Sequence, residues 1–369
     1  MARIITITSG KGGVGKTSIS LNLSLSLASK GYKVCLFDAD LGLANVNILT
    51  GIYPEKDLAN VIFEQAGLSD IMIKDFQGVD IIPGSSGVEK LADLTRDQTG
   101  RLINAFLDLK EYDYFIFDTS AGISSQVIAF CMASNEIILV ATCEPTSMTD
   151  AYSMLKTLSK HGYDNPVKIL INQVKTGKAA KSTYAQLKDT VKRFLTIKVE
   201  PLGIVGWDKS VRMAVISQTP FFMLFPNSLA SKCILAITEK LINKPDPAGD
   251  MPLEIFWDKC LAFFEKTNEL EQKKPTLQTE SRQDSDDQEN NIPKASISKN
   301  DMQTQQAIAR IESKLDNLAD QVARIRQILK AQSITPIEEP EPSRPVVPEP
   351  EKITLDFESW LQENKKQFS

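Results

Sequence analysis

Short apolar runs alternate with longer amphipathic stretches through the first two thirds of the chain. Runs near residues 3, 34, 80, 114, 137, 168 and 202 are rich in Ile, Leu, Val and Phe and have the length of buried strands. The stretches between them have helical spacing and are long enough for right-handed crossovers. The pattern predicts an α/β domain over 1–244, with a mostly parallel twisted sheet and helices on both faces.

The pattern changes after residue 244. A hinge containing Pro and Gly opens the segment 245–270, and apolar residues then recur at helical spacing. The polar face of this predicted amphipathic helix carries charges of both signs, so its attraction to anionic lipid is small. Two interpretations stay open: the helix docks on the domain, or residues 252–266 make a weak contact with a membrane.

Three further segments follow the amphipathic helix. Residues 271–302 have the composition of a disordered linker. Over 303–333 apolar residues are spaced alternately by three and four, which predicts a coiled coil of about three heptads. Its partner is not identified, and a lone helix that docks elsewhere is the alternative. Residues 334–369 form an extended tail rich in Pro and Glu, whose short terminal amphipathic segment either binds a partner or has no role.

Charge and cysteine usage exclude several functions. The formal net charge of −5 argues against a dedicated nucleic-acid binder, and we interpret one local cluster of cations as a solvated helix face: Lys175, Lys178, Lys181, Lys188, Lys192, Arg193 and Lys198. The five cysteines contain no Cys-x-x-Cys pair, which argues against an iron–sulfur cluster. Without a signal peptide or a membrane-spanning run, we expect a cytoplasmic protein, peripheral at the inner face of the membrane if the amphipathic helix binds lipid.

The candidate chemistry begins directly after the first strand, at Gly-Lys-Gly-Gly-Val-Gly-Lys-Thr over residues 10–17. Glycines allow several backbone N–H groups to converge on a phosphate, and the following helix adds the positive end of its dipole. Lys16 is placed to reach the β- and γ-phosphates of ATP, and Thr17 to ligate Mg²⁺. The predicted nucleotide-binding set is Gly10, Lys11, Gly12, Gly13, Val14, Gly15, Lys16, Thr17 and Ser18.

Carboxylates follow two other predicted strands. Asp38 and Asp40 end the second strand, and Asp118 ends the run that begins at Tyr112. The carboxyl ends of parallel strands share one edge of the sheet, where ligands bind. An Asp at a strand end is often only a turn or cap residue, but three at this order and spacing point to a Mg²⁺ site. Asn172 ends a further strand and taken alone would be a turn residue.

Lys11 lies inside the loop, where an ordinary phosphate-binding loop needs no charge. The run Lys-Gly-Gly-Val-Gly-Lys-Thr resembles the deviant Walker A loop of the MinD and ParA family of P-loop NTPases. The resemblance implies an ATP-dependent homodimer in which Lys11 contacts the partner's phosphates. It also implies roles for other positions: water orientation by Asp40, support of Mg²⁺ by Asp38 and, through water, Asp118, and adenine binding by Asn172. The predicted switch residues are Asp38, Asp40, Asp118 and Gly122. A solvated loop lysine is the alternative for Lys11.

Two longer motifs narrow the resemblance. Asp-Ala-Asp-Leu-Gly-Leu-Ala-Asn-Val and Glu-Pro-Thr-Ser-Met-Thr-Asp-Ala-Tyr are similar to the FlhG branch, also called FleN or YlxH, which controls flagellar number and placement. This implies a Mg²⁺-dependent ATPase switch with a flagellar GTPase or a transcription regulator as partner. The sequence lacks the short Gln-containing segment by which many members stimulate that GTPase. A MinD-type division-site ATPase, a ParA-type DNA partition ATPase and a scaffold with a degenerate core are the alternatives.

Overall fold

The fold is built on one sheet of eight strands. The computed structural model describes residues 1–40, 46–64, 66–84, 94–109, 112–244 and 249–272. The strands lie in the order β3-β4-β2-β5-β1-β6-β7-β8, and every neighbouring pair is parallel except β3 with β4. Their bounds are Arg3–Ser9 (β1), Val34–Ala39 (β2), Ile73–Phe76 (β3), Val79–Ile82 (β4), Tyr114–Ala121 (β5), Glu136–Thr142 (β6), Val167–Val174 (β7) and Val199–Gly206 (β8).

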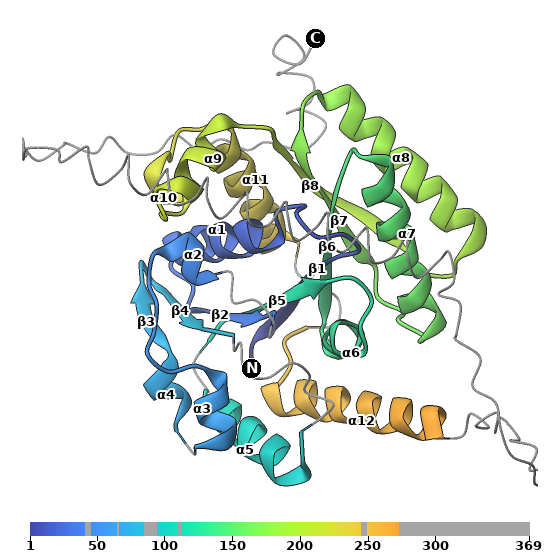
Figure 1. Ribbon diagram of the computed structural model, residues 1–369. Helices are drawn as coiled ribbons and strands as arrows, with labels where there is room; N and C mark the ends of the chain where they lie inside the picture. The colour runs from blue at the N-terminus through green and yellow to red at the C-terminus, as the bar shows by residue number, and fades with distance from the viewer. Residues whose placement is uncertain (41–45, 65, 85–93, 110–111, 245–248, 273–369) are drawn as a thin grey trace, which may run out of the picture. The chain divides into compact units, whose positions relative to one another are not determined.

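Helices connect the strands and cover both faces of the sheet (Figure 1). Helices α1 and α11 lie side by side, while α5, α6 and α12 pack together elsewhere on the sheet. The bounds are Lys16–Ser29 (α1), Val46–Thr50 (α2), Leu58–Phe63 (α3), Leu68–Ile71 (α4), Arg96–Leu107 (α5), Ser125–Ala133 (α6), Pro145–Lys160 (α7), Gly177–Phe194 (α8), Lys209–Ile216 (α9), Phe221–Leu224 (α10), Leu229–Asn243 (α11) and Leu253–Gln272 (α12).

All seven predicted strands are present, so the α/β prediction is confirmed. Strand β3 was not predicted, because it lies at the edge of the sheet and none of its residues is fully buried. It joins β4 through Gln77 and Gly78, whose φ angles of 52° and 85° are both left-handed. Two left-handed residues are typical of the tight turn of a β-hairpin, and they turn the chain back antiparallel to β4.

Alternate residues of β1 belong to different hydrophobic clusters. Ile5 and Ile7 pack in a cluster with α1 and α11, whereas Ile4 packs in one with α5, α6 and α12. Side chains of a strand point alternately to opposite faces, so a strand covered on both faces reads as a continuous apolar run. The seven residues of β1 are all buried, which explains why this strand was easy to predict.

Helix α12 docks on the domain and completes its second cluster. The ring of Phe256 lies 4.3 Å from that of Phe117 on β5, and the ring of Trp257 lies 4.9 Å from that of Phe106 on α5. Phe256 is 0% and Trp257 2% exposed, so each contributes roughly 1.5–3 kcal/mol of burial. The docking interpretation therefore describes this structure, and membrane contact by 252–266, which would remove these side chains from the core, stays a prediction.

A buried ion network closes the amino end of the sheet. Glu136, at the start of β6, is fully buried and accepts hydrogen bonds from both Arg3 and Lys168. Arg3 also donates to the carbonyl of Leu241 at 2.6 Å, near the end of α11. These contacts tie β1, β6, β7 and α11 together. Removing one partner would leave a buried charge uncompensated, which would destabilise the fold.

The predicted linker, coiled coil and tail, residues 273–369, lie outside the described residues, as do 245–248 of the hinge. Among the helices that are described, none is long and apolar enough to cross a membrane. The free thiols of Cys35, Cys131, Cys233 and Cys260 are buried, and Cys143 is partly buried.

Candidate nucleotide-binding site

The glycine loop occupies the turn between β1 and α1. Gly15 precedes the helix with φ of +90°, and a Cβ there would lie 2.5 Å from Nδ2 of Asn172. A Cβ on Gly10 would come within 2.2 Å of the backbone of Asp150 on α7. Glycine is therefore required at both positions. Gly12 and Gly13 are exposed, and a Cβ built on either would meet nothing within 4 Å, so this side of the loop is open to a ligand.

Asp38 and Asp118 face each other across two neighbouring strands. They are partners in the parallel register of β2 and β5, and both are 0% exposed. Burial raises the pKa of Asp38 to about 8, and the neighbouring Asp118 adds to the shift. Burial also raises the pKa of Asp118 to about 6, against the opposing effects of Thr17, Lys16 and Ser20. The two predicted metal-site carboxylates thus form one buried pair.

The donor atoms around this pair fit Mg²⁺. Asp118 accepts hydrogen bonds from Thr17 and, through Oδ1 at 2.8 Å, from Ser20. Its other oxygen, Oδ2, is buried without a hydrogen-bond partner. A buried carboxylate oxygen lacking a donor calls for a cation or its water, and hydroxyl and carboxylate oxygens are the ligands that Mg²⁺ prefers. Thr17, Asp38 and Asp118 would therefore hold the ion, Asp118 through water.

Lys16 is the buried cation of the site. It begins α1, is 8% exposed, and lies within the electrostatic reach of Asp118, Asp40 and Asp38. Burial lowers its pKa, and the three carboxylates oppose that shift. An ammonium held among carboxylates in a partly dry site supplies the positive charge that a triphosphate requires.

Asp40 and Gly122 adjoin the predicted switch regions. The N–H of Asp40 donates to Oδ1 of Asp38 at 3.2 Å, and residues 41–45 after it lie outside the described residues. Gly122 follows β5 with φ of +98°, and its N–H donates to the carbonyl of Ser9 at 2.9 Å. That hydrogen bond joins the segment after Asp118 to the start of the glycine loop. The water-positioning and switch roles stay predictions.

Asn172 lies against the glycine loop. Its Nδ2 donates to the carbonyl of Val14 at 2.8 Å, and its Oδ1 accepts from the N–H of Gln173 at 2.8 Å. Gln173 has a left-handed φ of 57°, and its side chain donates to the carbonyl of Gly13 at 3.2 Å. Asn172 thus lies beside the glycine loop, and adenine recognition by Asn172 stays a prediction.

Lys11 is paired within its own chain. Its Nζ lies 2.7 Å from Oε2 of Glu144 and 2.9 Å from Oγ1 of Thr146. Glu144 is the N-cap residue of α7, and Lys11 lowers the pKa of its carboxyl. A Thr or Ser cap would be expected for α7 from its sequence, but the helix begins one residue after Glu144, at Pro145, and has no side-chain cap. Both partners are exposed, so the pair is weak and easily exchanged.

Sequence reasoning missed three residues that touch the site. Ser20 lies one helical turn after Lys16, so helical spacing could have identified it as a partner of Asp118. Gln173 and Glu144 carried no such signal. Their contacts with Gly13 and Lys11 depend on how β7 and α7 meet the loop, which local sequence does not encode.

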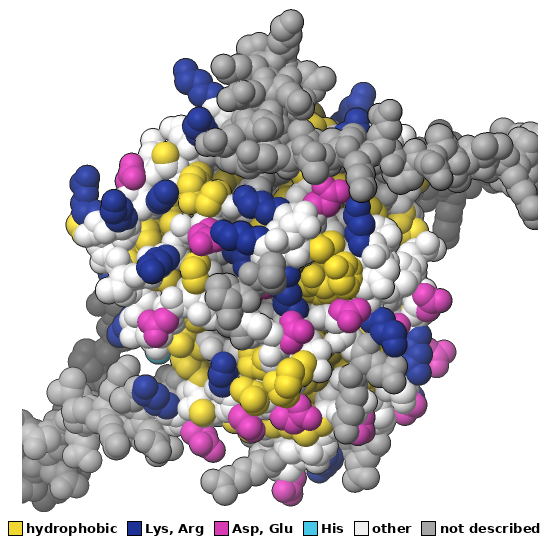
Figure 2. Space-filling model, turned by 180° about the vertical axis from the view of Figure 1, so that it is seen from behind, with side chains coloured by type: hydrophobic (Ala, Val, Ile, Leu, Met, Phe, Trp, Pro, Cys, Tyr) yellow, Lys and Arg dark blue, Asp and Glu magenta, His cyan; other side chains and the backbone are white. Residues whose placement is uncertain are grey.

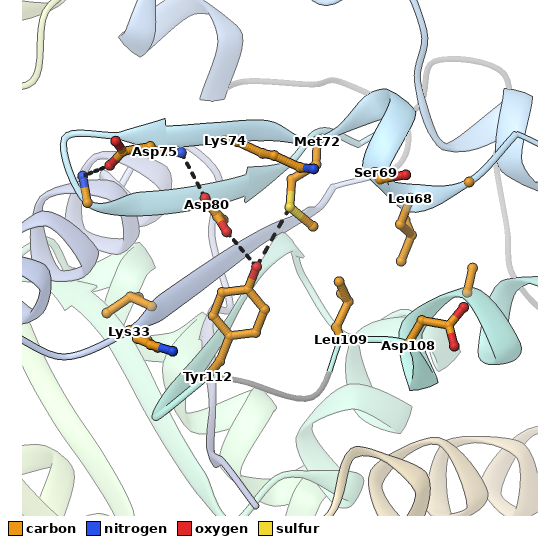
Figure 3. Close-up of a pocket in the computed structure, with 14 residues that line it drawn as sticks. Lys33, Leu68, Ser69, Met72, Lys74, Asp75, Asp80, Asp108, Leu109 and Tyr112 are labelled. Carbon is orange, nitrogen blue, oxygen red and sulfur yellow. Dashed lines mark hydrogen bonds between the residues drawn. The ribbon is translucent and has the colours of Figure 1, made fainter.

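A separate cavity of about 660 Å³ lies away from these residues (Figure 3). It borders the amino ends of β2 and β4, the edge of the sheet opposite to the glycine loop. Tyr112 points into it and donates to Asp80 at 2.6 Å. Its charged groups include both signs, as Lys33 and Lys74 stand with Asp75, Asp80 and Asp108. This cavity is large enough to hold a small ligand, but the chemistry for phosphate binding lies at the glycine loop.

Known proteins are similar to this chain in sequence and in fold. The chain matches the family model "AAA domain" over residues 2–169. It is 39% identical over 261 residues to the antiactivator FleN of Pseudomonas aeruginosa. This match covers 70% of this chain and 93% of FleN. The chain belongs to the MinD and ParA family of ATPases. Within that family it is close to the FlhG branch, as the motifs at Asp38 and Glu144 predict.

Two other similarities agree with this assignment. The flagellum site-determining protein YlxH of Helicobacter pylori is 34% identical, over 72% of this chain and 89% of YlxH. The septum site-determining protein MinD from Pyrococcus horikoshii, solved with Mg-ADP, is 25% identical with a TM-score of 0.52. The match covers 65% of this chain and 96% of that MinD. ATP and Mg²⁺ are therefore the ligands of the family fold, as the sequence predicts.

The buried carboxylate pair predicts how stability depends on pH without Mg²⁺. The unfolded chain loses both protons near pH 4, whereas the folded protein keeps them until about pH 6 and about pH 8. The folded state binds more protons in this window, so stability falls as the pH rises from about 4 to about 8. We expect the Tm measured in EDTA to fall as the pH rises across that window. The fall should be steeper for the unchanged chain than for the Asp38→Asn variant.

The control for this measurement is Asp164→Asn, which changes an exposed carboxyl. Its pH profile should follow that of the unchanged chain. A Tm that rises with pH over the window, or an unaltered slope in Asp38→Asn, would show that Asp38 is ionised in the ligand-free protein.

Proposed function

We propose that this chain is a nucleotide-dependent switch that hydrolyses ATP to ADP and phosphate and thereby controls the number or placement of flagella. One observation carries the proposal: Lys16, Asp38 and Asp118 converge behind an open glycine loop, in a chain 39% identical to FleN. Identity to MinD proteins is lower, 29% for that of Escherichia coli and 32% for the putative MinD of Oltmannsiellopsis viridis, so we favour flagella over the division site as the regulated structure. A flagellar GTPase or a transcription regulator is the proposed protein partner.

Each site residue has a distinct part in the proposed hydrolysis. Lys16 balances phosphate charge, and Thr17, Asp38 and Asp118 hold Mg²⁺, which would neutralise charge on the β- and γ-phosphates. Asp40 orients the attacking water. Asn172 presents a side-chain amide beside the loop, which suits the edge of an adenine. Electrostatic positioning of this kind is the main catalytic resource in phosphoryl transfer.

Lys11 links hydrolysis to dimer formation in this proposal. In the single chain it pairs with Glu144 at the start of α7. We propose that ATP draws it across the interface of a homodimer to the partner's phosphates. The exposed pair with Glu144 costs little to break, because both side chains regain water or phosphate contacts. Two lysines of one loop would thus serve two nucleotides.

Counting flagella tests the proposal in the source organism. We expect deletion of the gene to change the number or position of flagella per cell in electron micrographs, and the intact gene to restore them. A gene carrying Lys11→Ala should fail to restore them. The purified Lys11→Ala protein should still bind ATP but remain monomeric in light scattering, because its loop keeps Lys16 but lacks the charge that crosses the interface.

The matched control is Lys30→Ala, which removes an exposed lysine at the end of α1. It should restore flagella and dimerise with ATP. Flagella unchanged after deletion would refute the regulatory role. An ATP-dependent dimer in the Lys11→Ala protein would refute the crossing lysine and leave the regulatory role standing.

A further inference from the structure

A stripe of lysines runs along the exposed side of α8. One side of α8 packs toward the sheet. Its buried residues include Ala180, Thr183, Leu187 and Val191. Outside this buried side, spacings of three and four residues align four exposed lysines on one surface, which we call the lysine face: Lys178, Lys181, Lys188 and Lys192. Figure 2 shows Lys and Arg side chains gathered on the side of the molecule where α8 lies.

The lysine face is an uncompensated concentration of charge. Residues 175–198 contain seven cations and one acid, a net charge of +6, in a chain whose total is −5. Among the residues that the structure describes, no carboxylate pairs with Lys178, Lys181, Lys188 or Lys192. Like charges three or four residues apart on a helix repel by about 0.2–0.5 kcal/mol per pair. A linear polyanion laid along α8 would remove that repulsion.

The sequence beyond the described residues contains such a polyanion. Residues 338–363 hold eight acids and two bases, a net charge of −6, which matches the +6 around α8 in size and opposes it in sign. Six prolines occur over 336–350, and prolines at this density favour an extended backbone at about 3.1 Å per residue. The helix of 18 residues is about 27 Å long, so an extended segment of roughly nine residues spans it.

The chain is long enough to bring the two together. Helix α12 ends at Gln272, and 65 residues separate it from Glu338. A random coil of about 30 residues, fewer than the 65 of this stretch, has an end-to-end distance of roughly 30 Å, comparable to the size of a domain. Tethering gives an intramolecular ligand an effective concentration in the mM range, so weak ion pairs suffice for docking.

We propose that the acidic segment 338–363 of the C-terminal tail docks on the lysine face of α8 in the same chain. Free polyanions are at a disadvantage there, because the protein as a whole is acidic and repels them, whereas the tail is covalently attached. The docked segment covers the lysine face and neutralises its charge. This inference does not depend on the proposed flagellar role.

Carbodiimide cross-linking of the full chain tests the docking, because this reagent joins only a lysine and a carboxylate already in contact. We expect peptides joining the lysine face to Glu338–Glu358, with yields that fall by about fivefold or more in about 0.5 M salt. A variant with Lys178→Glu, Lys181→Glu, Lys188→Glu and Lys192→Glu should lose joined peptides. Adding Glu338→Lys, Glu339→Lys and Glu341→Lys to it should restore them through pairs of reversed polarity.

Lys156→Glu with Lys232→Glu is the matched control, since both lysines are exposed on other helices. It should leave the joined peptides unchanged. Mixing ¹⁴N and ¹⁵N chains separates joining within one chain from joining between two. Three results would overturn the proposal: joined peptides that survive the charge reversal, joined peptides that occur only between chains, or retention of duplex DNA by the lysine face that is the same with and without the tail charges.

Discussion

A Lys16→Ala variant is expected to lose nucleotide affinity by about 100-fold or more. Lys16 is buried within the electrostatic reach of Asp38, Asp40 and Asp118, and it is the group that would meet the β- and γ-phosphates. Without it, a triphosphate would enter a site that holds carboxylates and only Mg²⁺ to balance them. Titration with a fluorescent ATP analogue in the presence of Mg²⁺ measures the change directly.

Lys30→Ala on the same helix is the control for this loss. Lys30 follows the last residue of α1 and pairs at the surface with Glu239 at 3.3 Å. We expect its nucleotide affinity to match that of the unchanged chain. A nucleotide affinity of Lys16→Ala within about threefold of that of the unchanged chain, in a variant with an unchanged melting curve, would show that the glycine loop is not the phosphate site.

An Asp40→Ala variant is expected to bind ATP normally but to hydrolyse it about 100-fold more slowly or worse. Asp40 lies just beyond β2. Its backbone N–H donates a hydrogen bond to Asp38, and its carboxylate lies within the electrostatic reach of Lys16. Removing the side chain would take away the group proposed to orient the water, while the residues proposed to hold the phosphates and Mg²⁺ would stay in place. Phosphate release and light scattering with ATP should show a long-lived dimer.

Asp164→Ala provides the comparison, because Asp164 is exposed in the segment between α7 and β7. Its hydrolysis rate should be unchanged. If Asp40→Ala released phosphate at the normal rate, the water-positioning role would be wrong. If it failed to bind ATP, Asp40 would instead belong to the binding site.

The sequence was most predictive where one residue type has one physical use. Apolar runs predicted β1 and six further strands, and the glycines at 10 and 15 are required by contacts with Asp150 and Asn172. The positions of Asp38 and Asp118 at strand ends predicted that they meet, because parallel strands share a carboxyl edge.

Sequence was least predictive where a contact depends on tertiary placement. The pairing of Lys11 with Glu144 joins residues 133 apart, and the network of Arg3, Glu136 and Lys168 crosses three strands. Neither has a local pattern. Whether α12 docks was also undecidable from its amphipathic spacing, since a membrane and a protein core accept the same apolar face.

The in-register carboxylates on β2 and β5 make loading of the site an exchange of cations. Because burial raises its pKa to about 8, Asp38 keeps a proton at neutral pH when no metal is bound, and binding of Mg²⁺ to Asp38 in its proposed role would expel that proton. Nucleotide uptake would then acidify the surrounding solution. Its calorimetric heat will vary with the ionisation enthalpy of the buffer, and its apparent affinity will increase in mildly alkaline medium.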